Sequence, residues 1–583
     1  MTCLLAVARF DPRRCQTLAA LSNLAKVLTL RKVLYIISLY LKCSEHESFV
    51  TQKVILIVCS VLVLPACRLY SQVHPYRIDE ITIVRRHIFD TTDAGEKNFI
   101  GPLANSFHWL TKERVIRNEL LFSEYDTYDP ALLHETERNL RNLGFVGNIS
   151  TRVDTTSDST VRIEVHTQDK WTLGVSPSYQ QGGGVESFGF TTKDDNFLGN
   201  GQSVSVGYDH HTDRSNPHGI ETIFSERHLM GTRWATRLQY KNSESLRLTS
   251  ASFDRPYYSD EARWVANFYT DYSDIRIPYY QNGTRVQENI IGRQLQTAFY
   301  SSSFGDELKW RPAIGIVRIH SSGPYLRSFD NLDLLNVSMN VMRRTYHERV
   351  FVDNHGRIED VPEGILGNIL VGRNFHLSHP DGPDYYLQAN WLYSIAAGDF
   401  YYVSSTSSLN TYLGGTGHRE TTLDGTLLQY MKPQSDQTLV ARLSGTFGID
   451  WSPERQMYLG TSNGLRGYNN FAFAGQHRLV YTLEYRYFSP ASIWIFRPGA
   501  TAFIDGGTIW DQDDNIRNQR FHHSVGLGLQ IENTKQQGSG SIRIDLAYNA
   551  DERRFAGIII SSGVFFSAFQ DIGFISPVAT GDF

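Results

Sequence analysis

Residues 478–487 read RLVYTLEYRY, a run in which apolar and polar side chains alternate. The apolar set is Leu479, Tyr481, Leu483, Tyr485 and Tyr487, and the polar set is Arg478, Thr482, Glu484 and Arg486. A period of two places the sets on opposite faces of a β-strand. Such a run reaches the roughly 9–11 residues that a tilted strand needs to cross a bilayer, whereas strands of soluble sheets average roughly 5–6 residues. It therefore predicts a membrane-crossing strand with one face toward lipid.

The same alternation recurs after Lys170, for example at 233–241, 525–532 and 542–549. No run of 18 apolar residues follows Lys170, which argues against membrane-spanning helices. At about 20–30 residues for each strand with its connection, the sequence after residue 169 holds some 14 to 20 strands, and we predict sixteen. The predicted fold class is mainly β, a transmembrane antiparallel β-barrel at 170–566 with a C-terminal tail at 567–583.

A small α/β domain is predicted ahead of the barrel, at residues 76–169. Alternating runs at 78–83, 147–153 and 161–167 predict three strands. One helix is expected from Glu113 to Leu121. A second is expected after Asp129 as N-cap and Pro130 at the first helical position, ending at Gly144. The order is β-α-α-β-β.

A three-stranded sheet covered on one face leaves an edge strand whose backbone can pair with an incoming extended segment. We expect a client-binding edge formed by Ile78, Ile81, Ile83, Val161, Ile163 and Val165. A plain spacer domain is the alternative, and the sequence leaves both open.

Four motifs carry a family resemblance. Residues 195–201 read DNFLGNG, and residues 225–231 read SERHLMG. Residues 464–468 read GLRGY and precede Glu484-Tyr485-Arg486, and residues 503–507 read FIDGG. In this order the motifs resemble those of the BamA/TamA superfamily of outer-membrane insertases and translocases, also called the bacterial surface antigen family. The α/β domain likewise resembles a single POTRA repeat, where the best-known members have several.

The resemblance implies a loop that folds into the barrel lumen, with Arg466 paired to Asp505. Leu465, Gly467 and Tyr468 complete the loop motif, and Phe503 and Gly507 complete its partner. A planar guanidinium can bind a carboxylate in a fork, which would anchor such a loop. The family also implies a seam between the first and last strands, client polypeptides as substrates and no cofactor, metal ion or external energy source. Outer-membrane lipids, unfolded outer-membrane or secreted polypeptides and periplasmic assembly factors are the expected partners.

Composition agrees with a barrel. The net charge is -5, with 56 basic and 61 acidic residues, so no basic field favours nucleic acid as a partner. A mean hydropathy of -0.32 with 12% aromatic residues suits a polar lumen and aromatic girdles.

A leader is predicted at residues 50–71. Lys53 precedes an apolar stretch at 54–66, too short to span a bilayer comfortably, which favours a signal peptide over a buried core helix. Cleavage after Ser71 is favoured, and lipidation of Cys67 is the alternative. Residues 1–49 are interpreted as an upstream extension, with Val50 as the true start. The chain is thus expected in the bacterial outer membrane, with the POTRA-like domain in the periplasm.

Enzymatic interpretations are weaker. Gly460, Ser462 and Gly464 fit the Gly-x-Ser-x-Gly pattern, but a nucleophile elbow needs a following helix, and strand and loop are expected here. The pairs His210-His211 and His522-His523 lack the spacing of metal ligands. An outer-membrane phospholipase stays a formal alternative. A channel or surface anchor of the same architecture is the alternative to an insertase.

Overall fold

The computed structural model describes most of the chain from residue 76 onward. It covers residues 76–89, 102, 105–569 and 575, except short gaps at 158, 183–184, 213–216, 282–283, 325, 328–329, 356–357, 376, 378–381, 415–419, 453–455, 537–540 and 563. The predicted extension at 1–49 and signal peptide at 50–71 lie outside the described residues. Most of the predicted tail at 567–583 does so as well.

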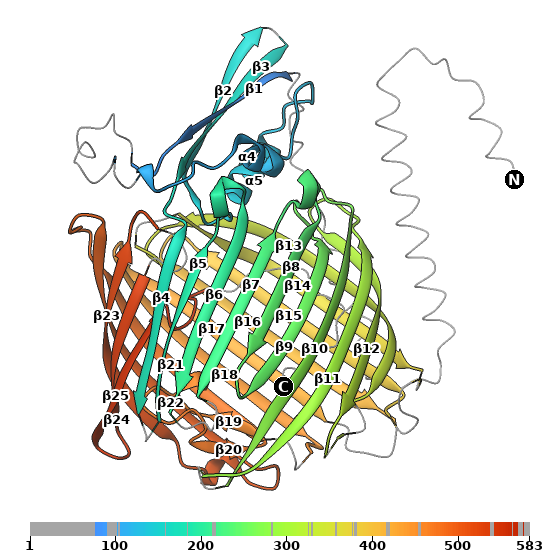
Figure 1. The fold of residues 1–583 in the computed structure, drawn as a ribbon, viewed down its shortest axis with the longest axis vertical. Helices are drawn as coiled ribbons and strands as arrows, with labels where there is room; N and C mark the ends of the chain where they lie inside the picture. The colour runs from blue at the N-terminus through green and yellow to red at the C-terminus, as the bar shows by residue number, and fades with distance from the viewer. Residues whose placement is uncertain are drawn as a thin grey trace, which may run out of the picture. The chain divides into compact units, whose positions relative to one another are not determined.

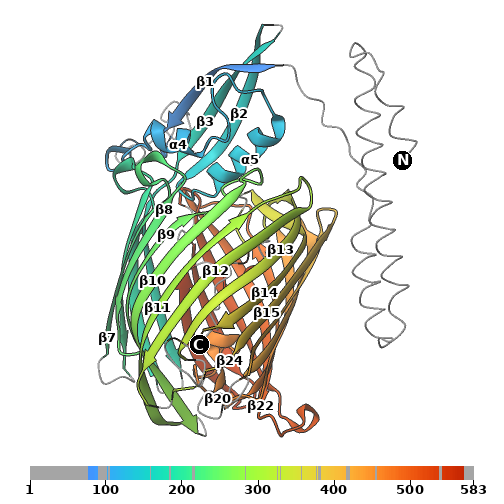
Figure 2. The same ribbon diagram turned by 90° about the vertical axis from the view of Figure 1, so that its right-hand side faces the viewer.

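The N-terminal part of the described chain is a three-stranded sheet with two helices. Its elements are β1 (Arg77–Arg86), α4 (Glu113–Glu119), α5 (Pro130–Arg141), β2 (Val146–Ser157) and β3 (Thr160–Asp169). The predicted order β-α-α-β-β is confirmed. The sheet order is β1-β3-β2, with β1 parallel and β2 antiparallel to the central strand β3. Figures 1 and 2 show both helices on one side of this sheet.

Local chemistry explains the best-marked helix of this domain. Asp129 caps α5 by accepting a hydrogen bond from the amide of Ala131 at 2.8 Å, and Pro130 opens the first turn. Gly144 follows the helix with φ +80°, a conformation that glycine adopts without steric cost. The apolar stripe of α5 packs with Ile116 of α4 and Ile163 of β3 in one buried cluster.

The rest of the structure is a closed antiparallel barrel of 20 strands (Figure 1). Its first half is β4 (Leu173–Gly182), β5 (Val185–Asp194), β6 (Gln202–His211), β7 (His218–Glu226), β8 (Ala235–Asn242), β9 (Leu246–Arg255), β10 (Trp264–Gln281), β11 (Thr284–Ser302), β12 (Lys309–Ser322) and β13 (Leu332–Arg349). Its second half is β14 (Glu359–Asn374), β15 (Tyr385–Ala397), β16 (Tyr401–Leu413), β17 (Thr421–Gln434), β18 (Gln437–Ile449), β21 (His477–Phe488), β22 (Phe496–Trp510), β23 (His522–Asn533), β24 (Ser541–Asn549) and β25 (Arg554–Ser562).

The predicted number of sixteen strands is wrong. Connections at one end of the barrel are very short, with residues 398–400 between β15 and β16 and residues 435–436 between β17 and β18. Each strand with its connection therefore uses fewer residues than the average length per strand that gave sixteen strands.

The alternation that predicted the strands separates the two faces of the barrel wall. On β21, Leu483 and Tyr485 are exposed on the outside, whereas Glu484 and Arg486 are 0% and 1% exposed on the inside. The same division holds on β24, where Leu546 faces outward and Asp545 inward. An apolar exterior and a polar interior fit a barrel that is solvated by lipid.

In the part of the chain that the structure describes, no helix is long and apolar enough to cross a membrane.

The barrel, predicted to run to residue 566, ends its last strand earlier. β25 ends at Ser562, and Phe565 and Phe566 follow it as irregular chain. Arg486 donates to the carbonyl oxygen of Phe566 at 2.7 Å, and Arg486 faces the interior. The chain thus turns into the lumen after β25 instead of continuing the wall to residue 566.

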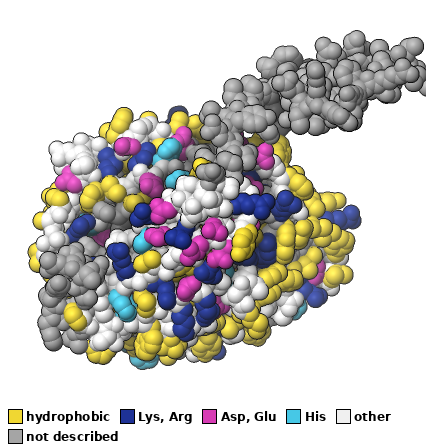
Figure 3. Space-filling view, turned by 90° about the horizontal axis from the view of Figure 1, so that it is seen from above, with side chains coloured by type: hydrophobic (Ala, Val, Ile, Leu, Met, Phe, Trp, Pro, Cys, Tyr) yellow, Lys and Arg dark blue, Asp and Glu magenta, His cyan; other side chains and the backbone are white. Residues whose placement is uncertain are grey.

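The small domain contacts connections at one end of the barrel. Neighbouring strands are antiparallel, so the connections after the second, fourth, sixth and tenth barrel strands (β5, β7, β9 and β13) all lie at the same end. Arg141 of α5 binds Asp360 with a fork of 3.1 and 2.9 Å. Asn139 donates to the carbonyl of Tyr258 at 3.0 Å. Figure 3 looks onto this end, where acidic and basic side chains are interspersed and hydrophobic ones gather along the edge.

Candidate functional site

The long connection 450–476 between β18 and β21 lies against the inner wall of the barrel. It contains a two-stranded sheet of β19 (Met457–Leu459) and β20 (Phe473–Gly475). Leu465 is fully buried in a cluster with Leu459 and Val480 of β21. Gly467 has φ +86°, and a Cβ there would lie 3.3 Å from the Cβ atoms of Ala547 and Ala556. A glycine is therefore required where this loop meets β24 and β25.

The structure brings Arg466 and Asp505 together. Arg466 Nε lies 2.7 Å from Asp505 Oδ2, and Nη2 lies 2.9 Å from Oδ1. The Arg466 amide also donates to Oδ2 at 3.3 Å. The guanidinium lies over the ring of Phe503, 3.4 Å from its centroid, and 4.2 Å from that of Phe565. The two-point fork, with rings beside it, fixes the position and plane of the arginine.

Further charges extend this pair into a network. Arg466 Nη1 donates to Glu484 at 3.0 Å and to Asp545 at 3.2 Å. Arg543 donates to both oxygens of Glu484 at 3.0 and 2.9 Å and to Asp545 at 2.8 and 2.9 Å. The strands β21, β22 and β24 thus supply the carboxylates that hold one loop arginine.

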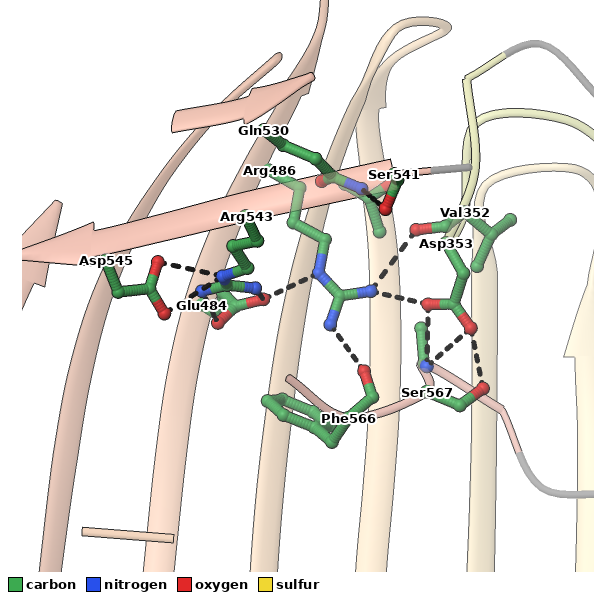
Figure 4. A network of polar contacts seen from close by, with 12 residues as sticks. Val352, Asp353, Glu484, Arg486, Gln530, Ser541, Arg543, Asp545, Phe566 and Ser567 are labelled. Carbon is green, nitrogen blue, oxygen red and sulfur yellow. Dashed lines mark hydrogen bonds and ion pairs between the residues drawn. The ribbon is translucent and has the colours of Figure 1, made fainter. Parts of the chain in front are cut away.

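Arg486 links the network to a second inward-folded segment, residues 350–358 between β13 and β14 (Figure 4). Its Nε donates to Glu484 at 2.8 Å, and its Nη1 donates to Asp353 at 2.5 Å. The cluster comprises the guanidinium groups of Arg466, Arg486 and Arg543 and the carboxylates of Asp353, Glu484, Asp505 and Asp545. Near-balanced charge makes the burial of so many ions tolerable.

The other residues of the predicted motifs also have defined places. The Tyr468 hydroxyl lies 2.9 Å from Asp551 Oδ2 and 3.1 Å from the His523 carbonyl. A Cβ at Gly507 would lie 3.3 Å from the Leu459 side chain, so the glycine lets the loop pack closely against β22. These contacts describe an anchored lumen loop, and the part that it plays in function stays a prediction.

Sequence reasoning did not assign Glu484, Arg486, Arg543 and Asp545 to this site. All four belong to the polar faces of strands recognised by alternation, so their inward direction could be predicted. Their mutual contact could not, because it depends on barrel register and on the depth that the loop reaches.

The predicted client-binding edge needs correction. Ile78, Ile81 and Ile83 lie on β1, and Val161, Ile163 and Val165 lie on β3. Because β3 is paired on both sides, it offers no edge. The side chains of these six residues pack in or against the helix-covered core. Their alternation marked a core face, which says nothing about which strand is outermost.

The edges of this sheet are β1 and β2. On β1, the segment after α4 already covers the first residues, since Ile78 donates to the Asp126 carbonyl and accepts from the Tyr125 amide. On β2, the exposed residues include Ser150, Arg152 and Thr155. The longer unobstructed edge among the described residues is therefore β2.

The two motifs in the first hairpins form the joint with the small domain. In residues 195–201, Asn196 Nδ2 donates to Thr111 Oγ1 at 2.8 Å, and the Gly199 carbonyl accepts from the Lys112 amide at 2.9 Å. A Cβ at Gly201 would lie 2.8 Å from Val115. This motif was recognised by resemblance, but the contacts that it makes were not predicted.

The motif at 225–231 repeats this arrangement one hairpin later. Leu198 and Met230 have nearly the same backbone, with φ 54° and 53°, and a glycine follows each. His228 Nε2 lies 2.9 Å from Glu119 Oε1 at the end of α4. Arg233 donates to the carbonyls of Asn118 and Leu120, the latter at 2.8 Å.

Two buried titratable groups lie at the joint. Asp169 Oδ2 accepts from the amide and the hydroxyl of Thr111 at 2.7 and 2.8 Å. Burial nevertheless raises the pKa of Asp169 to about 6. His108 Nε2 lies 3.5 Å from Asp169, and burial, with a repulsive contribution from His87, lowers the pKa of His108 to about 4. Both groups are therefore poised to be uncharged under mildly acidic conditions.

The residues of the enzymatic interpretations are not arranged for catalysis. Ser462 lies in a short 3-10 turn after β19, and its hydroxyl donates to Asn463 at 2.7 Å. His522 contacts Asp551 and His523 contacts Tyr481, at 2.6 and 2.9 Å. Among the described residues, no group of three or more His, Cys, Asp or Glu side chains could hold a metal ion.

Comparison with known families identifies the architecture. Residues 372–564, which run from β14 past β25, match the model of the Omp85 superfamily domain. Residues 108–168 match the POTRA model, described as a surface antigen variable number repeat. The chain therefore contains an Omp85 superfamily domain and a POTRA repeat. It has an Omp85 barrel, which lies in the outer membrane, and a single POTRA domain, which lies in the periplasm.

The superfamily also fixes the broad class of function. Omp85 members are transport and assembly proteins and not enzymes, and this chain has their outer-membrane insertase or translocator fold. A comparison with curated proteins finds no match.

Several solved structures are similar to this Omp85 chain. BamA from Haemophilus ducreyi lacking POTRA domains 1–3 is 12% identical, with 84% of each chain covered and a TM-score of 0.34. CdiB from Escherichia coli is 11% identical, with 84% of this chain and 77% of that chain covered and a TM-score of 0.44. CdiB from Acinetobacter baumannii is 11% identical, with 84% and 73% covered and a TM-score of 0.40.

Proposed function

We propose that this Omp85 protein inserts or translocates client polypeptides at the outer membrane, capturing client strands at the POTRA sheet edge and admitting them at the β4–β25 seam. Both steps use backbone pairing, which tolerates clients of varied sequence. The anchored lumen loop holds the wall of β21, β22 and β24 in place beside that seam.

The weak pairing of the seam is the observation that carries the proposal. Among the described residues, two pairs join β25 to β4, Ile559 with Gln180 and Ile560 with Tyr179. The next shortest ladder of the barrel, β7–β8, has seven. A barrel abolishes strand edges only where its ladder is complete, so this seam is the place that opens at least cost.

The edge of β4 supports this choice. Extending the register of the two pairs would place Phe566 opposite Leu173, but the chain has already turned into the lumen after Ser562. Residues 173–176 of β4, at its end nearest the POTRA domain, thus lie beyond the last residue of β25. Pro177 is next to this end, and a proline, which has no amide hydrogen, is tolerated on an edge strand.

Capture at the POTRA domain is assigned to β2. Its outer side faces away from β3, and a client strand added there would extend the sheet without displacing any of its three strands. Register shifts between Gly147 and Ser150 and between Thr155 and Ser157 limit regular pairing to the middle of the strand. We therefore place the capture edge at residues 150–155.

Depletion of the protein from cells tests this function. The proposal predicts that a set of outer-membrane or exported proteins accumulates unfolded in the periplasm, measured by protease sensitivity and by heat-modifiable gel mobility. A chain that is only a channel or a surface anchor would leave the folding of every such protein unchanged while altering permeability or surface binding. That outcome would refute the proposal.

A further inference from the structure

The chain beyond β25 occupies a defined site on the inner wall of the barrel. Arg486 Nη2 donates to the Phe566 carbonyl at 2.7 Å. The Asp353 carboxylate accepts from the Ser567 hydroxyl at 2.6 Å and from the Ala568 amide at 2.9 Å. Figure 4 shows Asp353 and Arg486 directed at this segment from the β13–β14 connection and from β21.

A second point of attachment lies on β13. Asn340 Nδ2 donates to the Ile575 carbonyl at 3.3 Å, and the Ile575 amide donates to Asn340 Oδ1 at 3.2 Å. The side-chain amide thereby pairs with both backbone groups of one residue, as a neighbouring strand would. Asn340 is fully buried on the inner face, so Ile575 lies inside the lumen.

Apolar contacts accompany these hydrogen bonds. Ala568 is 0% exposed and packs in a cluster that includes Val352 and Tyr430, with Phe566 and Phe569 against it. Ile575 packs against Met342 of β13 in a separate cluster. Buried apolar contacts of this kind hold a segment in place more firmly than hydrogen bonds to a solvated wall.

Most of these hydrogen bonds are made with backbone groups of the segment, so they do not depend on its side chains. The Asp353 carboxylate accepts from a backbone amide, the Arg486 guanidinium donates to a backbone carbonyl, and the Asn340 side chain does both. We propose that this inner wall, from Arg486 and Asp353 to Asn340, is a binding site for an extended polypeptide, and that the chain's own C-terminal segment fills it as a resident ligand. A client segment then displaces the C-terminal segment from this site. The displacement rests on the proposed function, whereas binding of the C-terminal segment to the inner wall does not.

Occupancy of this site is linked to the state of the seam. Phe566 cannot contact Arg486 and pair with Leu173 of β4 at the same time. While the segment stays in the lumen, the edge of β4 is left available for a client strand.

Thiol labelling tests the occupancy. The five cysteines all lie within the first 67 residues, so replacing them with serine leaves a background without thiols. We expect Ala568→Cys to react with a polar maleimide at least about ten-fold more slowly than the control Ala550→Cys, which lies exposed in the β24–β25 turn. A ten-fold difference corresponds to an opening that costs about 1.4 kcal/mol. Equal rates in folded, heat-modifiable protein would overturn the proposal.

A truncated chain tests the site itself. We expect protein lacking residues 567–583 to conduct ions more readily in planar bilayers, and a synthetic peptide of residues 564–575 to reverse the increase. Wild-type conductance in the folded truncation, or no effect of the peptide, would contradict the site. If the truncation does not fold, Ala568→Pro serves, because it removes the amide hydrogen bond that Asp353 accepts and disfavours the bound backbone. Neither readout uses a client, so failure here is distinguishable from failure of the assembly function.

Discussion

Arg466 of the lumen loop donates to both oxygens of Asp505 on β22, at 2.7 and 2.9 Å, and neither side chain is exposed. The same guanidinium reaches Glu484 and Asp545 on two other strands. One loop residue thus ties β21, β22 and β24 together from the inside. Loss of this arginine would leave three carboxylates buried with fewer cations.

Arg466→Ala is expected to destabilise the barrel strongly. Removing one partner of a buried ion pair typically costs about 3–5 kcal/mol, because the remaining charges are left uncompensated. The temperature at which the folded band disappears in a heat-modifiable gel should fall clearly. Arg343→Ala is the matched control, since its ion pair with Glu307 is exposed and is worth little. Equal melting of both variants would show that the network does not stabilise the barrel.

The stability of the POTRA domain should depend on pH through both Asp169 and His108, and the two contributions should have opposite signs. The pKa of Asp169 is raised to about 6 in the folded chain, so its contribution to stability is full below pH 4 and is lost as the pH rises through 6. The pKa of His108 is lowered to about 4, so its contribution is lost as the pH falls from 6.5 toward 4. The two effects oppose each other in the wild type.

Two variants reveal these opposing contributions. Asp169→Asn should leave the POTRA domain less stable at pH 5 than at pH 8 relative to wild type, and His108→Gln should do the reverse. The change for Asp169 amounts to at most about 3 kcal/mol. Urea unfolding of the POTRA domain, followed by fluorescence at both pH values, measures it. Parallel pH profiles in all three proteins would contradict the assignment.

Arg233→Ala should loosen the POTRA domain from the barrel. Its guanidinium donates to the carbonyls of Asn118 and Leu120, which the end of α4 leaves without helical partners. Hydrogen bonds from charged donors are worth about 1.5–3 kcal/mol. Limited proteolysis of the segment between α4 and α5 should be faster in this variant. Arg237→Ala on the same region of the barrel, exposed on β8, should cleave like wild type.

Photo-crosslinking tests the POTRA capture edge. A photoreactive residue at Arg152 of β2 should crosslink to client polypeptides in cells, because it lies exposed on the proposed edge. The same residue at Glu80 of β1 should crosslink far less, although Glu80 is also exposed. Similar yields at both positions would exclude β2 as the preferred edge.

The sequence predicted this structure best where one residue property repeats. Alternation at 478–487 identified a wall strand and both of its faces, and Asp129, Pro130 and Gly144 marked α5. The strand number failed because connections of two or three residues carry no strong turn signal of their own. The edge was predicted only in part: Ile78 lies on the edge strand β1 but Ile163 on the central strand β3, because burial, which both share, does not encode the order of strands in a sheet.

The site was partly predictable for a related reason. Arg466 and Asp505 lie in motifs that can be recognised in the chain. Glu484, Arg543 and Asp353 join them only through the register of distant strands and through a turn that folds inward. The barrel was predicted to run to residue 566, and only the contacts of Phe566 with Arg486 and of Ala568 with Asp353 show that the chain lies in the lumen there.

The most direct test of the proposed function is a disulfide across the seam. Tyr179→Cys with Ile560→Cys joins paired residues of β4 and β25, and Tyr179→Cys with Phe188→Cys joins β4 to β5 as the control. Both pairs are made in the background without native cysteines, and folding of client proteins is measured in cells depleted of the wild-type chain. The account predicts that the oxidised seam pair fails to restore folding, that reduction rescues it, and that the control pair restores folding in either state. Full activity with the seam locked would contradict the account.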